Sequence, residues 1–310
     1  CTGCMACVNL CGRKAISIED SIYAYNAVID NKKCINCDLC KNICQNNIQV
    51  EKRKPIVWYQ GWASKKEIRE KSSSGGAAAA LSQAFIKMGG VVCSCVYNKG
   101  QFGFEFAENE NDILKFTGSK YIKSNPDGIY GEIKDKIRDG KKVLFIGLPC
   151  QVAAVETYLG KKSSDLLYTV DLICHGTPSP KILKKFFEDY AVNIDDIRDI
   201  SFRKKTKFKI YNDYKKIVPD KIQDSYTYAF LKSLDYTENC YNCQFAKLDR
   251  ASDISIGDSW GSKLSSEEKE KGISLILVQS DKGYQLLMNS DMHLEDVDLK
   301  VAVSSNEQLE

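Results

Sequence analysis

Residues 1–11 (CTGCMACVNLC) and residues 34–44 (CINCDLCKNIC) decide how the first part of this chain folds. Each segment holds four cysteines, separated by two residues, two residues and then three residues. The second segment begins 33 positions after the first, and the similarity extends from 16–19 (ISIE) to 48–51 (IQVE) after a shift of one residue. The amino-terminal region is therefore an internal duplication.

The repeated spacing predicts two [4Fe-4S] clusters with crossed ligand sets. Three thiolates at two-residue spacing wrap one cubane cluster, and the fourth thiolate binds the other cluster. We therefore expect the first cluster on Cys1, Cys4, Cys7 and Cys44, and the second on Cys34, Cys37, Cys40 and Cys11. Structural zinc is the alternative, but it typically uses two CxxC pairs separated by about a dozen residues.

Residues 1 to about 52 resemble the bacterial two-cluster ferredoxin domain, which is a small α+β fold. A proline usually follows the fourth cysteine in that domain, whereas Gly12 and Gln45 stand at these positions here. This departure loosens the local turn and removes no ligand.

Composition narrows the class of protein further. The 310 residues carry 44 Lys and Arg against 41 Asp and Glu, so a net charge of +3 gives no electrostatic footprint for nucleic acid. No apolar stretch approaches the roughly 18 residues of a membrane span. The cysteines are grouped as metal ligands rather than as disulfides, so we expect a reducing, cytoplasmic location. We also expect a fragment of a longer protein, since Cys1 already lies inside a motif and the carboxyl end is polar.

A second domain is expected to follow the duplication. Residues 51–70 are charged, and beyond them short apolar runs alternate with amphipathic stretches, which is typical of α/β folds. We therefore divide the chain into a ferredoxin-like α+β domain at 1–55 and an α/β domain at 56–310. The larger domain should hold a mixed sheet with flanking helices.

A helix start is predicted within the larger domain. Residues 72–76 (SSSGG) precede an apolar stretch at 77–88 (AAAALSQAFIKM), which ends at Gly89 and Gly90. Backbone N–H groups at such a start can hold an anion, most plausibly a phosphate. Capping of the helix by a serine, with no ligand, is the commoner explanation.

Two consecutive strand–helix units predict neighbouring parallel strands. Residues 143–147 and 166–173 read as strands, and each is followed by a turn and a helix. Cys150 and Cys174 would then lie at the carboxyl edge of the sheet, where open α/β sheets bind ligands. Burial in the core is the usual fate of a single free thiol, but two at equivalent strand ends argue against it.

A further pair, Cys240 and Cys243, precedes a strand expected at 253–256. With Cys150 and Cys174 it completes a set of four thiols that would suit a third cluster. A redox-active dithiol and a zinc site are the competing interpretations. Cys93 and Cys95 share one face of an expected strand and are interpreted as packing residues.

A basic stretch at 203–216 holds seven basic residues and one acid, Asp213. We interpret it as a solvated hairpin. The alternative is a docking face for an acidic electron carrier or an anionic cofactor.

From about Ser72 to its end, the chain resembles the beta-subunit family of coenzyme F420-reducing hydrogenases and dehydrogenases. The resemblance rests on six segments in this order: KSSSGG (71–76), GSKYIKS (118–124), FIGLPCQVAAV (145–155), VDLICHGTPSP (170–180), CYNC (240–243) and DISIGDSWG (253–261).

This resemblance implies an FAD-containing module that passes electrons between iron–sulfur clusters and a hydride carrier. It places the flavin on Ser73, Ser74, Gly75, Gly76, Gly118, Ser119, Lys120, Gly147 and His175. Lys120 would neutralise a pyrophosphate. His175 is the candidate catalytic residue, as a donor to flavin or substrate, with a purely structural hydrogen bond as the alternative.

The leading hypothesis is thus an iron–sulfur flavoprotein oxidoreductase that works between a ferredoxin-like carrier, or a partner subunit, and a two-electron acceptor such as coenzyme F420. A flavin- and cluster-linked thiol reductase, with Cys240 and Cys243 as its dithiol, is the second possibility. The third is an electron-transfer subunit with no substrate of its own.

Overall fold

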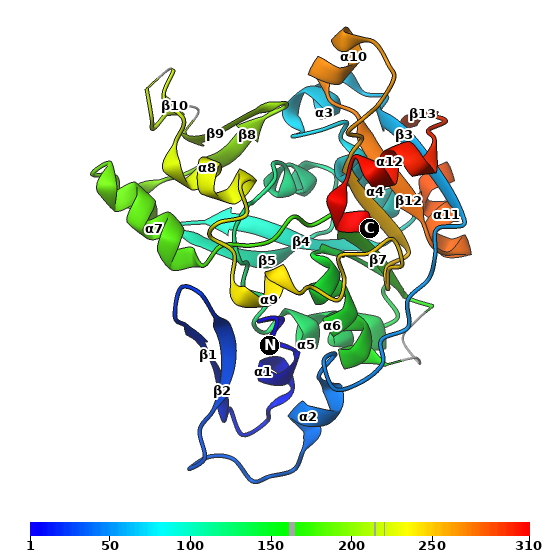
Figure 1. The fold of residues 1–310 in the computed structure, drawn as a ribbon. Coiled ribbons are helices and arrows are strands. Elements are labelled where there is room, and N and C mark those ends of the chain that lie inside the picture. Colours follow the sequence, from blue (N-terminus) through cyan, green and yellow to red (C-terminus); the bar gives the residue numbers. More distant parts are fainter. Residues whose placement is uncertain (161–164, 214, 220) are drawn as a thin grey trace.

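The computed structural model describes residues 1–160, 165–213, 215–219 and 221–310. Within these residues an eight-stranded mixed sheet forms the centre of the larger part of the molecule, in the order β13-β3-β12-β11-β7-β6-β4-β5 (Figure 1). The strands are β3 (Val57–Ala63), β4 (Val91–Asn98), β5 (Gln101–Ala107), β6 (Val143–Gly147), β7 (Leu167–Leu172), β11 (Ile254–Asp258), β12 (Ser274–Val278) and β13 (Met292–Glu295).

The centre of this sheet is parallel and its two flanks are antiparallel. β4, β6, β7 and β11 pair in parallel, as the two strand–helix units predict for β6 and β7. β5, β12, β3 and β13 join by antiparallel pairing. The mixed α/β fold expected from the sequence is confirmed.

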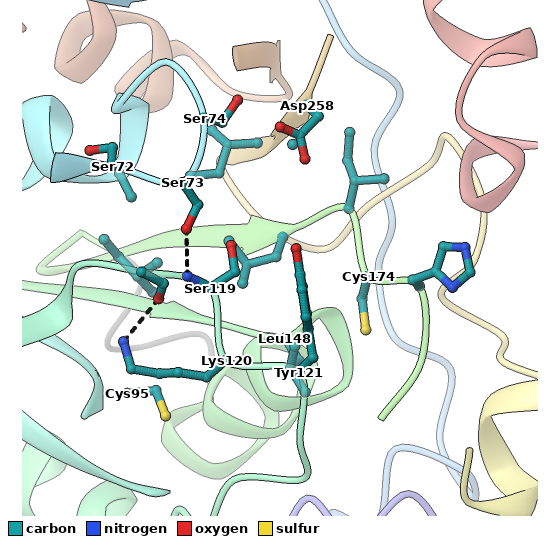
Figure 2. A pocket seen from close by; sticks show the side chains of 18 of the residues that line it. Ser72, Ser73, Ser74, Cys95, Ser119, Lys120, Tyr121, Leu148, Cys174 and Asp258 are labelled. Atoms are coloured by element: carbon teal, nitrogen blue, oxygen red, sulfur yellow. Dashed lines mark hydrogen bonds between the residues drawn. The ribbon is translucent and has the colours of Figure 1, made fainter. Parts of the chain in front are cut away.

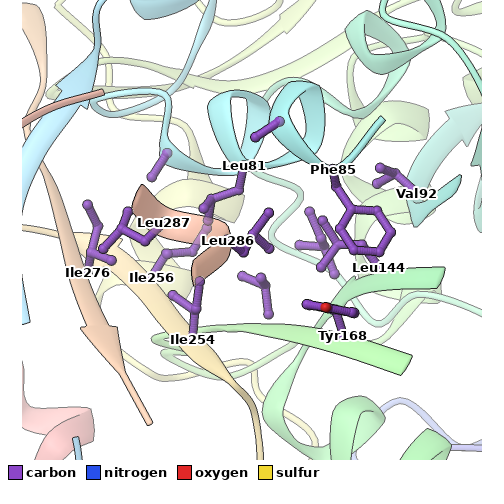
Figure 3. Close-up of a cluster of buried hydrophobic side chains, with 14 of the residues drawn as sticks. Leu81, Phe85, Val92, Leu144, Tyr168, Ile254, Ile256, Ile276, Leu286 and Leu287 are labelled. Carbon is purple, nitrogen blue, oxygen red and sulfur yellow. The ribbon is translucent and has the colours of Figure 1, made fainter. Parts of the chain in front are cut away.

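Both faces of the sheet are covered because its central strands are apolar on both sides. In β6 every residue is buried, with Leu144 and Ile146 turned to one core and Val143 and Phe145 to the other. The helices α4 (Ala77–Lys87) and α11 (Asp281–Met288) cover the first face, and Figure 3 shows their side chains against the strands. The helices α5 (Ile129–Arg138) and α6 (Pro149–Leu159) cover the second.

The amino-terminal part repeats its backbone as well as its sequence. It consists of α1 (Ala6–Leu10), β1 (Ile16–Asp20), β2 (Tyr25–Ile29) and α2 (Leu39–Ile43), which is the small α+β arrangement that was expected. α1 and α2 occupy equivalent positions 33 residues apart. Left-handed φ angles also recur in both loops, at Gly3 and Met5 and again at Asn36 and Asp38.

The remaining elements form smaller lobes around the sheet. A three-stranded sheet of β8 (Ile200–Lys204), β9 (Lys207–Asn212) and β10 (Lys215–Lys216) confirms the basic hairpin. The remaining α-helices are α3 (Lys66–Lys71), α7 (Pro180–Asp189), α8 (Ser225–Leu231), α9 (Glu238–Tyr241), α10 (Ser266–Lys271) and α12 (Leu299–Ser304), and the 3-10 helices are η1 (Asn111–Phe116), η3 (Ile194–Asp196) and η4 (Glu307–Leu309). Across the residues the structure describes, no helix is both long and apolar enough to cross a membrane.

Candidate functional site

A cavity of about 510 Å³ lies where the central strands of the sheet end. Gly147 and Leu148 border it at the end of β6, Ile173 and Cys174 at the end of β7, and Asp258 at the end of β11. The carboxyl ends of parallel strands are where open α/β sheets bind ligands. Figure 2 shows side chains from several distant segments around this one space.

The cavity brings together eight of the nine residues expected to hold a flavin. Those lining it are Ser73, Ser74, Gly76, Gly118, Ser119, Lys120, Gly147 and His175. Gly75 does not line it. A Cβ at Gly75 would lie 2.4 Å from the Gly61 carbonyl oxygen and 2.7 Å from the Ser274 amide, so close backbone packing explains this glycine.

The serines before α4 do not cap that helix, which corrects the commoner explanation of the SSSGG segment. The N-cap position is Gly76, with a φ of 92° and no side-chain cap hydrogen bond. The Ser73 hydroxyl instead accepts a hydrogen bond from the Ser119 amide at 2.8 Å (Figure 2), and Ser74 donates to the Ile273 carbonyl at 2.9 Å. The amide groups at the start of α4 therefore remain available beside the cavity.

The Lys120 ammonium is held by its own loop. It donates to the carbonyl oxygens of Phe116, Thr117 and Gly118, each at 3.0 Å. Three donors are all that a lysine has, so none is left for a direct phosphate contact in this arrangement. Burial lowers the pKa of Lys120. Beside it, Gly118 has a φ of 84° and open space around it where a Cβ would stand.

Two further residues of the cavity were missed from the sequence. Arg203 is 5% exposed and forms a bidentate pair with Asp258 at 2.7 and 2.8 Å, while it donates to the Ser73 carbonyl at 2.8 Å. The interpretation of the whole basic stretch as solvated is therefore wrong for Arg203, because it is buried and the partly exposed Asp258 carboxylate satisfies its charge. Asp258 belongs to the DISIGDSWG segment, which was the available signal.

His175 lines the cavity and contacts a tyrosine. Its Nδ1 lies against the Tyr236 hydroxyl, which is also hydrogen-bonded to the Phe230 carbonyl at 2.7 Å. A neutral imidazole can either donate to that hydroxyl or accept from it through Nδ1, so both neutral tautomers fit the contact. Burial lowers the pKa of His175 and favours a neutral form.

The four cysteines expected to form a third site lie near one another. Burial is the main cause that raises the pKa of Cys174 to about 12, and the charges of Cys240 and Cys243 add to it. The pKa of Cys150 is also raised well above its usual value by burial, with contributions from Cys174 and Cys243. Metal binding would displace these protons, because a ligating cysteine is a thiolate.

Cys240 differs from its neighbours in its hydrogen bonding. Burial alone would raise its pKa, but the Lys123 charge and hydrogen bonds from the Thr237 and Thr177 hydroxyls lower it. Each of these hydroxyl contacts to Cys240 Sγ measures 3.6 Å. Of Cys150, Cys174 and Cys240, it is therefore the thiol most readily converted to a thiolate.

Both β4 cysteines pack against hydrophobic clusters, as expected, but Cys95 also has a second environment. Cys93 is fully buried between strand and helices, as a packing residue should be. Cys95 lies on the same strand two residues later but lines the cavity beside Lys120 (Figure 2). The end of β4 reaches the carboxyl edge of the sheet, which the alternation pattern alone did not reveal.

A second cavity, of about 30 Å³, lies in the amino-terminal part and is lined by one of the two predicted ligand sets. Cys1, Cys4, Cys7 and Cys44 all line it. Burial raises the pKa of Cys7 to about 11, with further contributions from Cys4, Cys44 and Cys40. Backbone amides also donate to these sulfurs, for example from Gly3 and Ala27 to Cys1 Sγ at 3.5 Å.

In the second predicted set, Cys37 is exposed and the other three members are partly buried, which are Cys34, Cys40 and Cys11. In the described parts of the chain, no three His, Cys, Asp or Glu side chains form a group that could hold a metal ion.

The amino-terminal part packs directly on the cysteine edge of the sheet. Gln45 is 2% exposed and donates to the Cys150 carbonyl at 2.9 Å. The Tyr130 hydroxyl of α5 donates to the Cys4 carbonyl at 2.9 Å. Cys4 is also one of the charges that raise the pKa of Cys150, so the two groups of cysteines are electrostatic neighbours.

Comparisons with known proteins identify related sequences and a related fold. Two family models match, and both describe the beta subunit of coenzyme F420 hydrogenase/dehydrogenase: the model of its C terminus covers residues 140–298, and the model of its N terminus covers 58–126. The coenzyme F420 hydrogenase subunit beta of Methanococcus voltae is 27% identical over 184 residues, which are 57% of this chain and 59% of the relative. The chain thus matches about three-fifths of that relative's length.

A solved structure also shares the fold. It is reported as a xenon derivatization of the F420-reducing [NiFe] hydrogenase complex from Methanosarcina barkeri. The TM-score is 0.58 at 23% identity, and the match covers 83% of this chain and 91% of the other.

Proposed function

Because the chain belongs to the coenzyme F420 hydrogenase/dehydrogenase beta subunit family, we propose that it is an iron–sulfur flavoprotein subunit of an electron-transferring oxidoreductase. Residues 1–55 would hold two [4Fe-4S] clusters, and residues 56–310 would hold FAD and a third cluster. Electrons would pass between a protein carrier or partner subunit and a hydride carrier such as coenzyme F420. One observation carries this proposal: Cys174 lines the large cavity and also belongs to the group of four neighbouring cysteines.

The cavity residues suit a flavin with its phosphates at the start of α4. The amides there have no side-chain cap, and the space beside Gly118 is open where a Cβ would stand. Arg203 donates a hydrogen bond to the Ser73 carbonyl and thereby holds the Ser73 loop in place. When bound, a flavin exchanges a hydride as an electron pair and releases electrons singly. His175 lines the cavity in a mainly neutral form and is the candidate group of this chain for donating or accepting a proton there.

The amino-terminal cysteines suit clusters by their donor set and by their surroundings. Free thiols, backbone N–H donors to sulfur and repeated left-handed loop positions occur together in both halves of the duplication. Hydrogen bonds to ligand sulfurs are among the features by which a protein tunes such a cluster. The small cavity lined by Cys1, Cys4, Cys7 and Cys44 supports the crossed assignment.

A thiol reductase is the second candidate, and the lowered pKa of Cys240 favours it. A reactive dithiol needs one accessible thiolate of this kind. That reaction requires only Cys240 and Cys243, so it leaves Cys150 and Cys174 without a role.

The test of function uses the full chain, purified anaerobically and reconstituted with iron, sulfide and FAD. Reduced methyl viologen is the electron donor, and oxidised coenzyme F420 or a disulfide is offered as acceptor. Bleaching of the deazaflavin absorbance is the expected result. Reduction of the disulfide alone would favour the thiol reductase, and a loaded protein that reduces neither acceptor would leave only an electron-transfer subunit.

A further inference from the structure

Lys123 is a buried lysine to which the resemblance assigns no role. Lys123 is 4% exposed. Its backbone amide donates to the Pro178 carbonyl at 3.0 Å, and this hydrogen bond anchors the main chain. It belongs to the same GSKYIKS segment as Lys120, but the two ammonium groups have different surroundings. The Lys120 ammonium has three carbonyl acceptors at 3.0 Å. For Lys123 the acceptor is the Thr2 carbonyl, at the longer distance of 3.4 Å.

The charge of Lys123 lacks a carboxylate counter-ion. Among the residues that the structure describes, no Asp or Glu lies within ion-pairing distance of its Nζ. An ammonium removed from water is costly unless an opposite charge or several acceptors compensate for it. The single long contact to Thr2 does not do so, which leaves the ammonium in need of a negative partner.

Hydrogen bonds link this ammonium to the four-cysteine group. It donates to the Thr2 carbonyl at 3.4 Å, and the Thr2 hydroxyl and the Cys150 carbonyl both accept from the Gln45 side-chain amide at 2.9 Å. Lys123 acts electrostatically on Cys150, Cys174 and Cys240, which lie on three different segments of the fold. Its contact with Thr2 also places it against the loop between Cys1 and Cys4. The side chain therefore occupies the junction between the four-cysteine group and the first amino-terminal cysteine loop.

We propose that Lys123 is the counter-ion of the third cluster and raises the reduction potential of that cluster. This inference rests on the proposed function, since it requires that Cys150, Cys174, Cys240 and Cys243 hold iron. Four thiolates give an oxidised [4Fe-4S] centre a net negative charge, and reduction adds one more electron to it. A fixed positive charge nearby stabilises the reduced form more than the oxidised form.

The proposed change in reduction potential also bears on the direction in which electrons flow. A third cluster that is easier to reduce accepts electrons more readily from the amino-terminal clusters. Lys123 is a tuning residue and need not touch a substrate.

The test compares full-length wild-type protein with Lys123→Met and Lys123→Arg, and it uses Lys184→Met on the exposed face of α7 as a matched control. Iron per chain is counted, and each cluster is followed by EPR during an anaerobic redox titration. Lys123→Met should make the third cluster at least about tenfold harder to reduce, which is a fall of about 59 mV for one electron. Lys123→Arg and Lys184→Met should stay close to wild type.

The outcomes separate this inference from the proposed function. If wild-type protein contains only about eight irons, it has no third cluster, and this result contradicts the function proposed above as well. About twelve irons with an unchanged potential in Lys123→Met would overturn the role of Lys123 alone. If Lys123→Met loses the third cluster, its retention in Lys123→Arg supports the counter-ion role, and loss from both variants contradicts it.

Discussion

The Gln45 side-chain amide donates hydrogen bonds to the Cys150 carbonyl and to the Thr2 hydroxyl, both at 2.9 Å. Gln45 stands directly after Cys44, where a bacterial ferredoxin usually has proline. Proline has no side-chain donor and could make neither contact. The departure from the ferredoxin pattern thus creates the joint between the amino-terminal part and the sheet edge that bears Cys150.

Replacement of Gln45 by leucine should weaken this joint. The Cys150 carbonyl and the Thr2 hydroxyl would lose a buried partner, which costs about 1–3 kcal/mol. We expect a lower midpoint in anaerobic urea unfolding, whereas Gln49→Leu, at an exposed position, should have little effect. Equal midpoints for the two variants would show that the hydrogen bonds of Gln45 do not stabilise the packing of the two parts.

A negative charge at the start of α4 should expel the flavin. We expect Gly76→Asp to bind FAD at least about tenfold more weakly than Gly76→Asn, because only aspartate repels a phosphate there. Both substitutions meet the same strain at the left-handed φ of 92° and the same close approach of the new Cβ to Ser72 and Ala63, so these costs are matched between the variants. The measurement is an FAD titration followed by fluorescence. Equal affinities would place the phosphates elsewhere.

Loss of Arg203 should affect stability and flavin binding together. Arg203→Ala leaves the partly exposed Asp258 carboxylate without its partner, at a cost of about 1–3 kcal/mol, and frees the Ser73 loop. Lys207→Ala on the exposed part of the same hairpin is the control. The readouts are the unfolding midpoint and the FAD affinity. A variant that loses stability but binds FAD as tightly as wild type would contradict the bracing role.

The buried carboxyl of Glu156 predicts a dependence of stability on pH. Burial, with a contribution from Asp253, raises its pKa from 4.5 to about 8, against the opposing effects of Arg53, Lys282 and Thr169. The folded protein therefore holds a proton that the unfolded chain releases, and the stability from this group falls as pH rises from 4.5 to about 8. Glu156→Gln should flatten that slope in urea unfolding at a series of pH values. An unchanged slope would mean that Glu156 is ionised in the fold.

The main elements of the sheet were predictable because their signals are local. The fully apolar run of β6 and the turn after it predict a buried strand and a helix, and the structure has both. β11 begins one residue later than expected and continues through Asp258, so Asp258 stands at the end of the strand itself. The duplicated cysteine spacing likewise predicted a duplicated backbone.

The contacts that complete the site were not predictable, because they join distant segments. Arg203 belongs to a run of basic residues, and nothing local marks it as the one that meets Asp258. Lys120 and Lys123 are three residues apart in one segment. Lys120 lines the cavity, whereas the charge of Lys123 acts on Cys240. The sequence identifies the groups, and only the fold determines which of them meet.

The measurement that tests the central claim most directly is the iron and flavin content of the full chain before and after Cys174→Ser. We predict about twelve irons, about twelve sulfides and one FAD per chain, and about eight irons in the variant. Cys93→Ser, at a buried thiol of the packing core, should retain about twelve. Unchanged iron in Cys174→Ser, with Cys240 and Cys243 open to alkylation, would contradict the third cluster and favour the dithiol.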